Sequence, residues 1–371
     1  MTTEDLSGLF ANGDRGAQQM HALLIDPKVW QITCDRHDRI SVVGADGTTR
    51  LDRIFGSAQM YIGWINELMR LTDVGYTDVT TAKTSVIEGS FRPDKIPVHG
   101  SIHICTWEIT RGEPAVTVRK QPNELITLDD MFRQGMMNAD MRLFLEQAVR
   151  GRSNILLSGG SGSGKTTLAR ALSYFVDPAH RVITVEEIDE LHLYDRLPNV
   201  AALTTFRSRD DEGRMLREVD LNDLVRESLR MRADRVWVGE TRGNEAYALV
   251  KACNSGHDGS VTTLHADSGK QAIRQLVTYV MMAGLSEVPA REQVAQAFDL
   301  VVQISKVRMG QRVITEVTEL EKVLEGPQQR LNTLYKYDLD RQVWSQDARP
   351  THNLIRNWAK YGVNYESPGR R

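Results

Sequence analysis

The chain has 371 residues, which is enough for two domains that each bury a core. Its formal net charge of −3 gives no general reason to expect binding to nucleic acid or to an anionic membrane. The three cysteines are widely spaced, which argues against a disulfide framework or a zinc site and fits a reducing, cytosolic compartment. No apolar run approaches the ~18 residues of a membrane span, so we expect a soluble protein whose membrane contact is peripheral.

The first 124 residues are predicted to form one α+β domain. Residues 30–52 alternate apolar and polar side chains around a Gly-Ala-Asp-Gly turn, which predicts a β-hairpin. Residues 57–73 carry apolar side chains at helical spacing, and residues 98–110 and 114–122 return to strand patterns. A Gln-Pro-Asn break then ends the regular pattern, and we place the domain boundary after it.

Residues 125–371 are predicted to form a second, α/β domain. A helical stretch leads into apolar runs that alternate with helices, and this alternation favours a largely parallel sheet. The runs are NILLS at 154–158, RVITVEE at 181–187, RVWVGE at 235–240, GSVTTLHA at 259–266 and LVVQISK at 300–306. A short helix is expected in the tail.

The stretch LLSGGSGSGKTTLARAL fits the phosphate-binding pattern G-x-x-x-x-G-K-[ST] between a predicted strand and a predicted helix. A glycine-rich turn that binds nothing is the alternative, but the strand–loop–helix context favours an anion cradle of backbone N–H groups. Lys165 is expected to contact the β- and γ-phosphates of a nucleotide, and Thr166 to bind Mg²⁺. The residues expected to surround the phosphates are Gly160, Ser161, Gly162, Ser163, Gly164, Lys165, Thr166 and Thr167.

Two later strands end in acids, as hydrolysis requires. One run ends in Glu186 and Glu187, and another ends in Glu240. Ligands gather at the carboxyl ends of parallel strands, the same edge that carries the phosphate loop. A solvated turn is the alternative for each acid alone, but two such ends beside a phosphate loop favour catalysis, with one acid orienting water and one near Mg²⁺.

The stretch NSGHDGSVTTLHADS places His257 and His265 on either side of a predicted strand. A metal site is one possibility, but no cysteine or third histidine lies close enough to complete it. A histidine of the core or surface is another. We favour a polar sensor that contacts the γ-phosphate or the attacking water, since this strand belongs to the same predicted sheet.

Taken in order, these elements resemble the secretion ATPase superfamily, the hexameric motors of type II and type IV secretion and of type IV or Tad pilus assembly. GGSGSGKTTL is similar to its Walker A loop, RVITVEEIDEL to its acidic box, and LNDLVRESLRMRADRVWVGETRGNEAYALVKACNSGHDGSVTTLHADS to its Walker B and histidine-box region. The resemblance implies a RecA-like P-loop ATPase domain preceded by a smaller α+β domain. It also implies Mg²⁺-dependent ATP hydrolysis by a homo-hexamer at the inner face of the cytoplasmic membrane, against secretion or pilus platform proteins.

The resemblance also implies roles for individual residues. Glu186 would polarise the attacking water and Glu240 would hold the Mg²⁺ shell through water, although Glu187 stands where aspartate is usual and either glutamate of that pair can face the water. Arg119 and Arg207 match positions where family members place arginines that reach the γ-phosphate, and a surface ion pair is the alternative for both.

Three functions share these motifs. A secretion or pilus motor is favoured, and the missing zinc-binding cysteine cluster argues against the type II branch while leaving Tad pilus and conjugation open. A hexameric nucleic-acid translocase or helicase has the same core, but no aromatic and basic platform for single strands is evident. A small-molecule kinase would not need the second acidic strand end, the histidine box or the leading domain.

Overall fold

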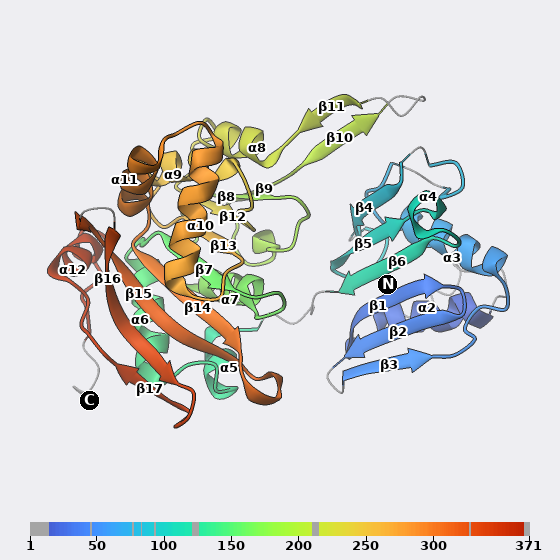
Figure 1. The fold of residues 1–371 in the computed structure, drawn as a ribbon, viewed down its shortest axis with the longest axis horizontal. Helices are drawn as coiled ribbons and strands as arrows, with labels where there is room; N and C mark the ends of the chain where they lie inside the picture. Colours follow the sequence, from blue (N-terminus) through green and yellow to red (C-terminus); the bar gives the residue numbers. More distant parts are fainter. Residues whose placement is uncertain are drawn as a thin grey trace. The chain divides into compact units, whose positions relative to one another are not determined.

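The computed structural model describes residues 15–44, 47–75, 78–82, 84–92, 94–120, 126–209, 215–325 and 328–366. The chain divides into two compact units, residues 1–124 with 207–217 and residues 125–206 with 218–371. The break after residue 124 falls in the segment 121–125, outside the described residues. Figure 1 shows the elements of both units.

The first unit is built on a six-stranded antiparallel sheet of order β3-β2-β1-β6-β5-β4 (Figure 1). Alternate strand residues such as Ile32, Ile102 and Val118 pack with Met20 and Trp64 of the helices, so the helices cover one face. The elements are α2 Arg15–Ile25, β1 Val29–Arg36, β2 Arg39–Gly44, β3 Gly47–Leu51, α3 Ala58–Arg70, β4 Val86–Ser90, β5 Gly100–Cys105, α4 Trp107–Thr110 and β6 Ala115–Lys120.

The strand and helix predictions for this unit are confirmed, with two differences. The region predicted as one hairpin over 30–52 forms three antiparallel strands, β1 to β3, because the chain also turns at residues 37 and 38, and the helix predicted over 57–73 is α3. The strand predicted over 98–110 ends at Cys105, and Trp107–Thr110 form a short helix instead. The Thr110 hydroxyl donates to the Thr106 carbonyl at 3.1 Å, a local bond that favours the helical turn over the extended chain.

The second unit is built on a nine-stranded sheet of order β17-β16-β15-β14-β7-β13-β12-β8-β9. The strands from β14 to β9 are parallel, and β14 to β17 are antiparallel. Its strands are β7 Ile155–Gly159, β8 Val182–Glu186, β9 Val200–Thr204, β12 Arg235–Val238, β13 Val261–Leu264, β14 Leu300–Lys306, β15 Arg312–Glu325, β16 Gln328–Asp338 and β17 Val343–Gln346. A separate two-stranded sheet, most of which groups with the first unit, joins β10 Phe206–Arg209 and β11 Met215–Val219.

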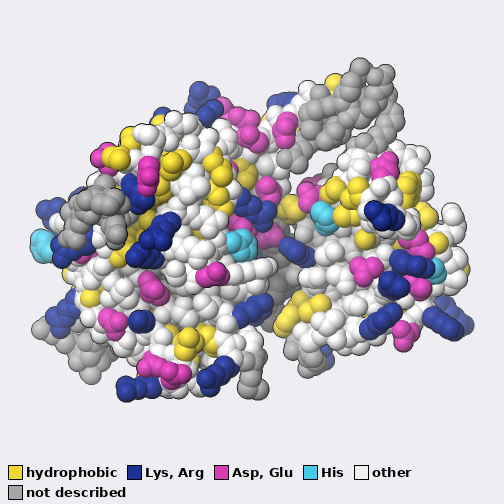
Figure 2. All heavy atoms as spheres, in the orientation of Figure 1, with side chains coloured by type: hydrophobic (Ala, Val, Ile, Leu, Met, Phe, Trp, Pro, Cys, Tyr) yellow, Lys and Arg dark blue, Asp and Glu magenta, His cyan; other side chains and the backbone are white. Residues whose placement is uncertain are grey.

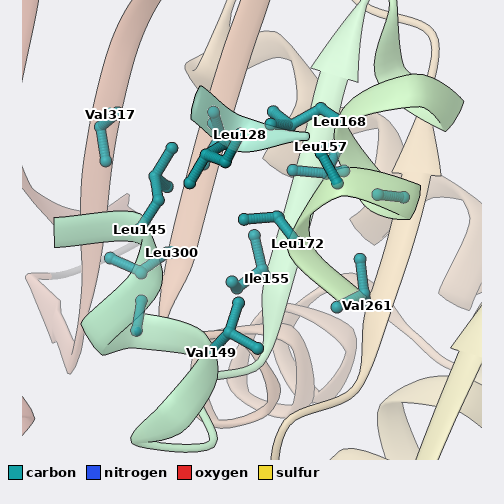
Figure 3. Packing of buried hydrophobic residues seen from close by; sticks show 14 of the residues in the cluster. Leu128, Leu145, Val149, Ile155, Leu157, Leu168, Leu172, Val261, Leu300 and Val317 are labelled. Carbon is teal, nitrogen blue, oxygen red and sulfur yellow. The ribbon is translucent and has the colours of Figure 1, made fainter. Parts of the chain in front are cut away.

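Helices cover both faces of this sheet, which explains why its parallel strands are continuous apolar runs. Along β7, Ile155 and Leu157 enter one core, and Leu156 enters the other. The first core, part of which Figure 3 shows, includes α5 Leu128–Arg133, α6 Ala139–Arg150, α7 Lys165–Leu172 and α12 His352–Ala359. The second includes α8 Leu221–Ser228, α9 Glu245–Asn254, α10 Gly269–Met282 and α11 Glu287–Ala297. Short 3-10 helices are Ser173–Phe175, Leu193–Asp195 and Arg308–Gly310.

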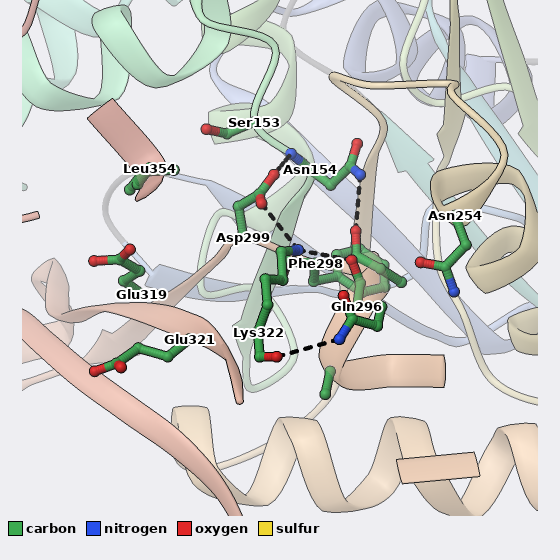
Figure 4. A network of polar contacts seen from close by, with 12 residues as sticks. Ser153, Asn154, Asn254, Gln296, Phe298, Asp299, Glu319, Glu321, Lys322 and Leu354 are labelled. Atoms are coloured by element: carbon green, nitrogen blue, oxygen red, sulfur yellow. Dashed lines mark hydrogen bonds and ion pairs between the residues drawn. The ribbon is translucent and has the colours of Figure 1, made fainter. Parts of the chain in front are cut away.

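A polar network fastens the amino-terminal ends of β7 and β14 (Figure 4). The Asp299 carboxylate accepts the Asn154 backbone N–H at 2.8 Å and lies 3.0 Å from Lys322 Nζ. Lys322 also donates to the carbonyls of Gln296 and Phe298 at 2.7 and 2.9 Å. Because these half-buried charges are matched, the network aligns the antiparallel β15 with the parallel sheet.

The surface carries charges of both signs. On the face shown in Figure 2, basic and acidic side chains are interspersed over the described part of each unit. None of the described helices is long and apolar enough to cross a bilayer.

Candidate active site

The loop between β7 and α7 has the backbone of an anion cradle. Gly162 and Gly164 have φ of 64° and 103°, in the left-handed region that favours glycine. Gly164 caps α7 with no side-chain hydrogen bond, so the first N–H groups of the helix face the loop without a capping acceptor. Such a helix start attracts phosphate groups through its N–H groups and the helix dipole.

Close packing holds this loop in place. A Cβ on Gly159 would lie 2.3 Å from the Ile304 carbonyl oxygen and 2.6 Å from Ser163 Oγ, so only glycine fits there. The Arg312 guanidinium donates to the Gly162 carbonyl at 3.1 Å. Ser163 Oγ is buried and has no hydrogen-bond partner among the described residues, and a phosphate oxygen would satisfy it.

Lys165, in the first turn of α7, is buried beside the loop that it follows. Its Nζ donates to the carbonyls of Gly159 and Gly160 at 2.9 and 3.1 Å and lies 3.4 Å from His265 Nδ1. Burial lowers the pKa of Lys165, and the charge of Glu240 opposes that shift. The ammonium is therefore held at the phosphate loop by neutral oxygen atoms and one imidazole.

A chain of polar contacts runs outward from Lys165. His265 Nε2 lies 3.0 Å from Glu240 Oε1, and the other oxygen of Glu240 accepts from Arg242 at 2.9 Å. Arg242 reaches on to Glu187, whose carboxylate lies 3.1 Å away. Since the Lys165 ammonium can only donate, His265 Nδ1 accepts from it, and Nε2 carries the imidazole proton on the side of Glu240.

Strand order explains why these residues meet. The site residues follow the carboxyl ends of β7, β13, β12 and β8. They are distant in sequence, but these four strands are consecutive in the sheet. Burial lowers the pKa of His265, with Glu240 opposing and Lys165 adding to the shift. A hydrogen bond from Arg242 to Glu240, together with the Glu240 charge, raises the pKa of Arg242. The cluster thus holds a neutral histidine between two cations and a carboxylate.

The two acids at the end of β8 lie in different environments. The Glu186 carboxylate is buried, and its Oε1 accepts the backbone N–H groups of Glu190 and Leu191, each at 3.1 Å. Burial, with the negative charge of Asp189, raises the pKa of Glu186 well above its ordinary value. Glu187 is exposed and pairs with Arg242. A carboxyl whose pKa is raised towards the working pH suits a general base, which favours Glu186. Glu187 instead contacts Arg242, which also pairs with Glu240.

The other predicted residues of the phosphate loop differ in their exposure to solvent. Thr166 and Thr167 lie half-buried in the first turn of α7, and Gly160 and Ser161 lie exposed in the loop. Thr166 and Glu240 offer a hydroxyl and a carboxylate, the oxygen ligands that Mg²⁺ prefers, directly or through water.

Three further predicted residues lie on other elements of the chain. His257 precedes β13 and lies 3.2 Å from the Ala252 carbonyl at the end of α9, so it sits at the opposite end of that strand from His265. Arg119 is exposed on β6 of the first unit. Arg207 belongs to β10, and its side chain lies outside the described part of the structure.

Two functional residues were not identified from the sequence, Arg242 and Glu245, which holds the backbone at Arg242 in place. Glu245 is buried, and its Oε1 accepts the N–H groups of Arg242 and Gly243 at 2.5 and 2.8 Å, which fixes the turn after β12. The position of Arg242, two residues after Glu240, was the available signal. Lys306 was also missed; it lies at the end of β14, with Nζ 2.9 Å from where a Cβ on Gly162 would be.

Known proteins are similar to this chain in sequence and in fold. The family of type II/IV secretion system proteins matches residues 94–347, more than half of the chain. The chain belongs to this family. The resemblance to secretion ATPases seen in the motifs is confirmed.

Two relatives illustrate this membership, and one solved structure shares the fold. The probable conjugal transfer protein TrbB of Sinorhizobium fredii is 33% identical over 244 residues, 65% of this chain and 68% of that protein. The type IV secretion system protein VirB11 of Bartonella quintana is 31% identical over 232 residues, 62% of this chain and 63% of that protein, so the chain spans less than two thirds of this relative. The Legionella pneumophila ATPase DotB matches with a TM-score of 0.56 at 18% identity, covering 85% of this chain and 81% of that chain. The expected fold, a P-loop ATPase domain preceded by a smaller α+β domain, is confirmed.

Proposed function

We propose that this secretion-family protein is an ATP-hydrolysing hexameric motor for type IV secretion, conjugation or Tad-type pilus assembly. The observation that carries the proposal is the contact chain from Lys165 through His265 to Glu240, beside a phosphate loop whose buried Ser163 hydroxyl is unmatched among the described residues. The relatives named for conjugal transfer and type IV secretion support the choice of machinery.

The residues divide the work of hydrolysis. Backbone N–H groups from Gly160 to Thr167 and the Lys165 ammonium would hold the phosphates. Thr166, and Glu240 through water, would hold Mg²⁺, which when bound neutralises charge on the phosphate oxygens. Glu186 would accept a proton from the attacking water, with Glu187 as the alternative base.

His265 is proposed as the sensor of the γ-phosphate. Its Nδ1 already lies 3.4 Å from Lys165, so a ligand that draws the ammonium away also alters the contact between His265 and Glu240. We also propose that Arg119 and Arg207 reach the nucleotide when the motor assembles, which would couple ATP binding to movement of the leading domain. The site of action would be the inner face of the cytoplasmic membrane, against platform proteins of the machinery.

An ATPase assay of the full chain with and without Mg²⁺ tests the proposal. Lys165→Ala should abolish turnover because the phosphates lose their main side-chain charge. Lys251→Ala is the matched control, since this lysine lies on α9, where its ammonium is 5.5 Å from the centre of the Tyr247 ring. Wild-type turnover in Lys165→Ala would reject the phosphate-loop assignment.

The same assay separates the alternatives. Strong stimulation by single-stranded DNA with a steep salt dependence would favour a translocase. Transfer of phosphate to a small acceptor in place of water would favour a kinase. Particle images with nucleotide test the ring directly.

A further inference from the structure

Three side chains on the first unit's sheet form a contact line unrelated to the phosphate loop. His103 and Cys105 are two residues apart on β5, so they lie on the same face. Glu88 pairs with His103 across the antiparallel β4–β5 ladder. The alternate residues, Ile102 and Ile104, are fully buried in the core, which leaves the polar line on the opposite face.

The distances define a proton path. Glu88 Oε1 lies 2.8 Å from His103 Nδ1, and His103 Nε2 lies 3.4 Å from Cys105 Sγ. The Glu88 carboxylate can only accept, so Nδ1 carries the imidazole proton and Nε2 presents its lone pair to the thiol. A nucleophile, a base and a carboxylate that orients the base are the parts of an activated thiol.

We propose that Cys105 is a thiol–disulfide exchange site for small disulfides such as glutathione disulfide, with His103 as its base. The thiol proton moves to His103 Nε2, and the imidazolium formed is stabilised by Glu88. The thiolate attacks one sulfur of the disulfide, so a Cys105–sulfur bond forms, the disulfide bond breaks and one thiolate leaves. That thiolate takes up the proton, and no further oxidant is needed.

The side chains around Glu88, His103 and Cys105 leave this line open to solvent, and those directly opposite on β6 add no charge to it. The side chains of His103 and Glu88 are 46% and 51% exposed. The residues opposite the thiol and the imidazole on β6, Ala115 and Thr117, carry no charge, and Arg119 lies further along that strand, opposite Ser101.

On α4, the neighbouring carboxylate is already engaged. Glu108 accepts a hydrogen bond from the Ser85 hydroxyl at 2.8 Å. Among the described residues that flank the line on β4, β6 and α4, Glu88 is therefore the acid in contact with His103.

Cys105 is half-buried and is the most exposed of the three cysteines. Cys34 and Cys253 are buried, at 0% and 5% exposure, and burial raises the pKa of the Cys253 thiol to about 12. Because only thiolates attack disulfides, these two cysteines are protected in the folded protein. One modified cysteine per chain is expected.

Incubation of the reduced full chain with glutathione disulfide, followed by intact-mass spectrometry, measures the exchange rate. A free thiol holds only a few per cent thiolate at pH 7, so proton transfer to His103 can raise the exchange rate by about tenfold. Part of this gain is lost because a less basic thiolate is a weaker nucleophile. We expect His103→Ala to slow the reaction about three- to tenfold between pH 6 and 8. Above pH ~9.5, where thiols ionise unaided, its rate should approach that of the wild type.

Matched variants isolate the cause. His37 bonds the Glu113 carboxylate at 2.7 Å in the same unit, a contact that involves no thiol, so His37→Ala should leave the rate unchanged. Cys105→Ser should give no adduct on the folded chain, and Glu88→Gln should fall between wild type and His103→Ala. Equal pH profiles for wild type and His103→Ala, or an adduct on Cys105→Ser, would overturn the proposal.

Discussion

Replacing Glu186 by glutamine tests both the buried carboxyl and its proposed role. The introduced amide would keep an oxygen to accept the N–H groups of Glu190 and Leu191, bonds that measure 3.1 Å in the wild type, but it cannot ionise. Burial and the charge of Asp189 raise the folded-state pKa of Glu186 above the ~4.3 of an unfolded glutamate. Between those two pKa values, the folded protein therefore binds one more proton than the unfolded chain.

The sign of the effect follows from this difference. The stability that neutral Glu186 contributes is fully present below the unfolded pKa and is lost as pH rises through the folded pKa. The wild-type free energy of unfolding should therefore fall by up to about 1.4 kcal/mol per pH unit from this group, and Glu186→Gln removes that slope. The variant should therefore gain on the wild type as pH rises from 5, until the pH passes the folded pKa of Glu186.

Urea unfolding at pH 5, 6, 7 and 8 measures this difference, and Glu187→Gln, an exposed position on the same segment, is the control. A difference between Glu186→Gln and wild type that stays constant with pH would refute the reasoning. The same protein should bind nucleotide but turn over ~10² times more slowly if Glu186 is the base. Normal turnover there, with loss in Glu187→Gln, would assign the base to Glu187.

Three further changes have defined outcomes. Arg242→Ala should raise the pKa of His265, because the Arg242 charge lowers it; NMR titration of the histidine measures this, and an unchanged pKa would contradict the electrostatic assignment. Gly259→Ala should destabilise the protein by about 2–4 kcal/mol, since Gly259 has a φ of +86° and a Cβ there would lie 2.3 Å from Arg235 Nη1; urea unfolding at wild-type stability would exclude that clash. Arg119→Ala should cut ATP turnover while leaving the fold intact, and wild-type turnover should rise with protein concentration; a dilute, fully active monomer would remove the ring mechanism.

Spacing along the chain is enough to specify several local elements. Glycines at fixed intervals between an apolar strand and a helix specify the phosphate loop, because left-handed φ values at Gly162 and Gly164 and close contact at Gly159 admit no other residue easily. Continuous apolar runs predict the parallel strands, because both faces of the sheet are covered. The long β15–β16 hairpin escaped prediction, since its strands mix buried residues such as Val317 with exposed polar ones.

Which charges meet depends on the tertiary fold. Strand order brings Glu240 and His265 beside Lys165, although the three lie in separate parts of the sequence. The adjacent Glu186 and Glu187, at the end of β8, differ in burial and in partners. The Glu186 side chain points into the core, whereas the Glu187 side chain points toward Arg242. A carboxyl's pKa and partners depend on burial and on charges within a few ångströms, and residues far apart in the chain supply both.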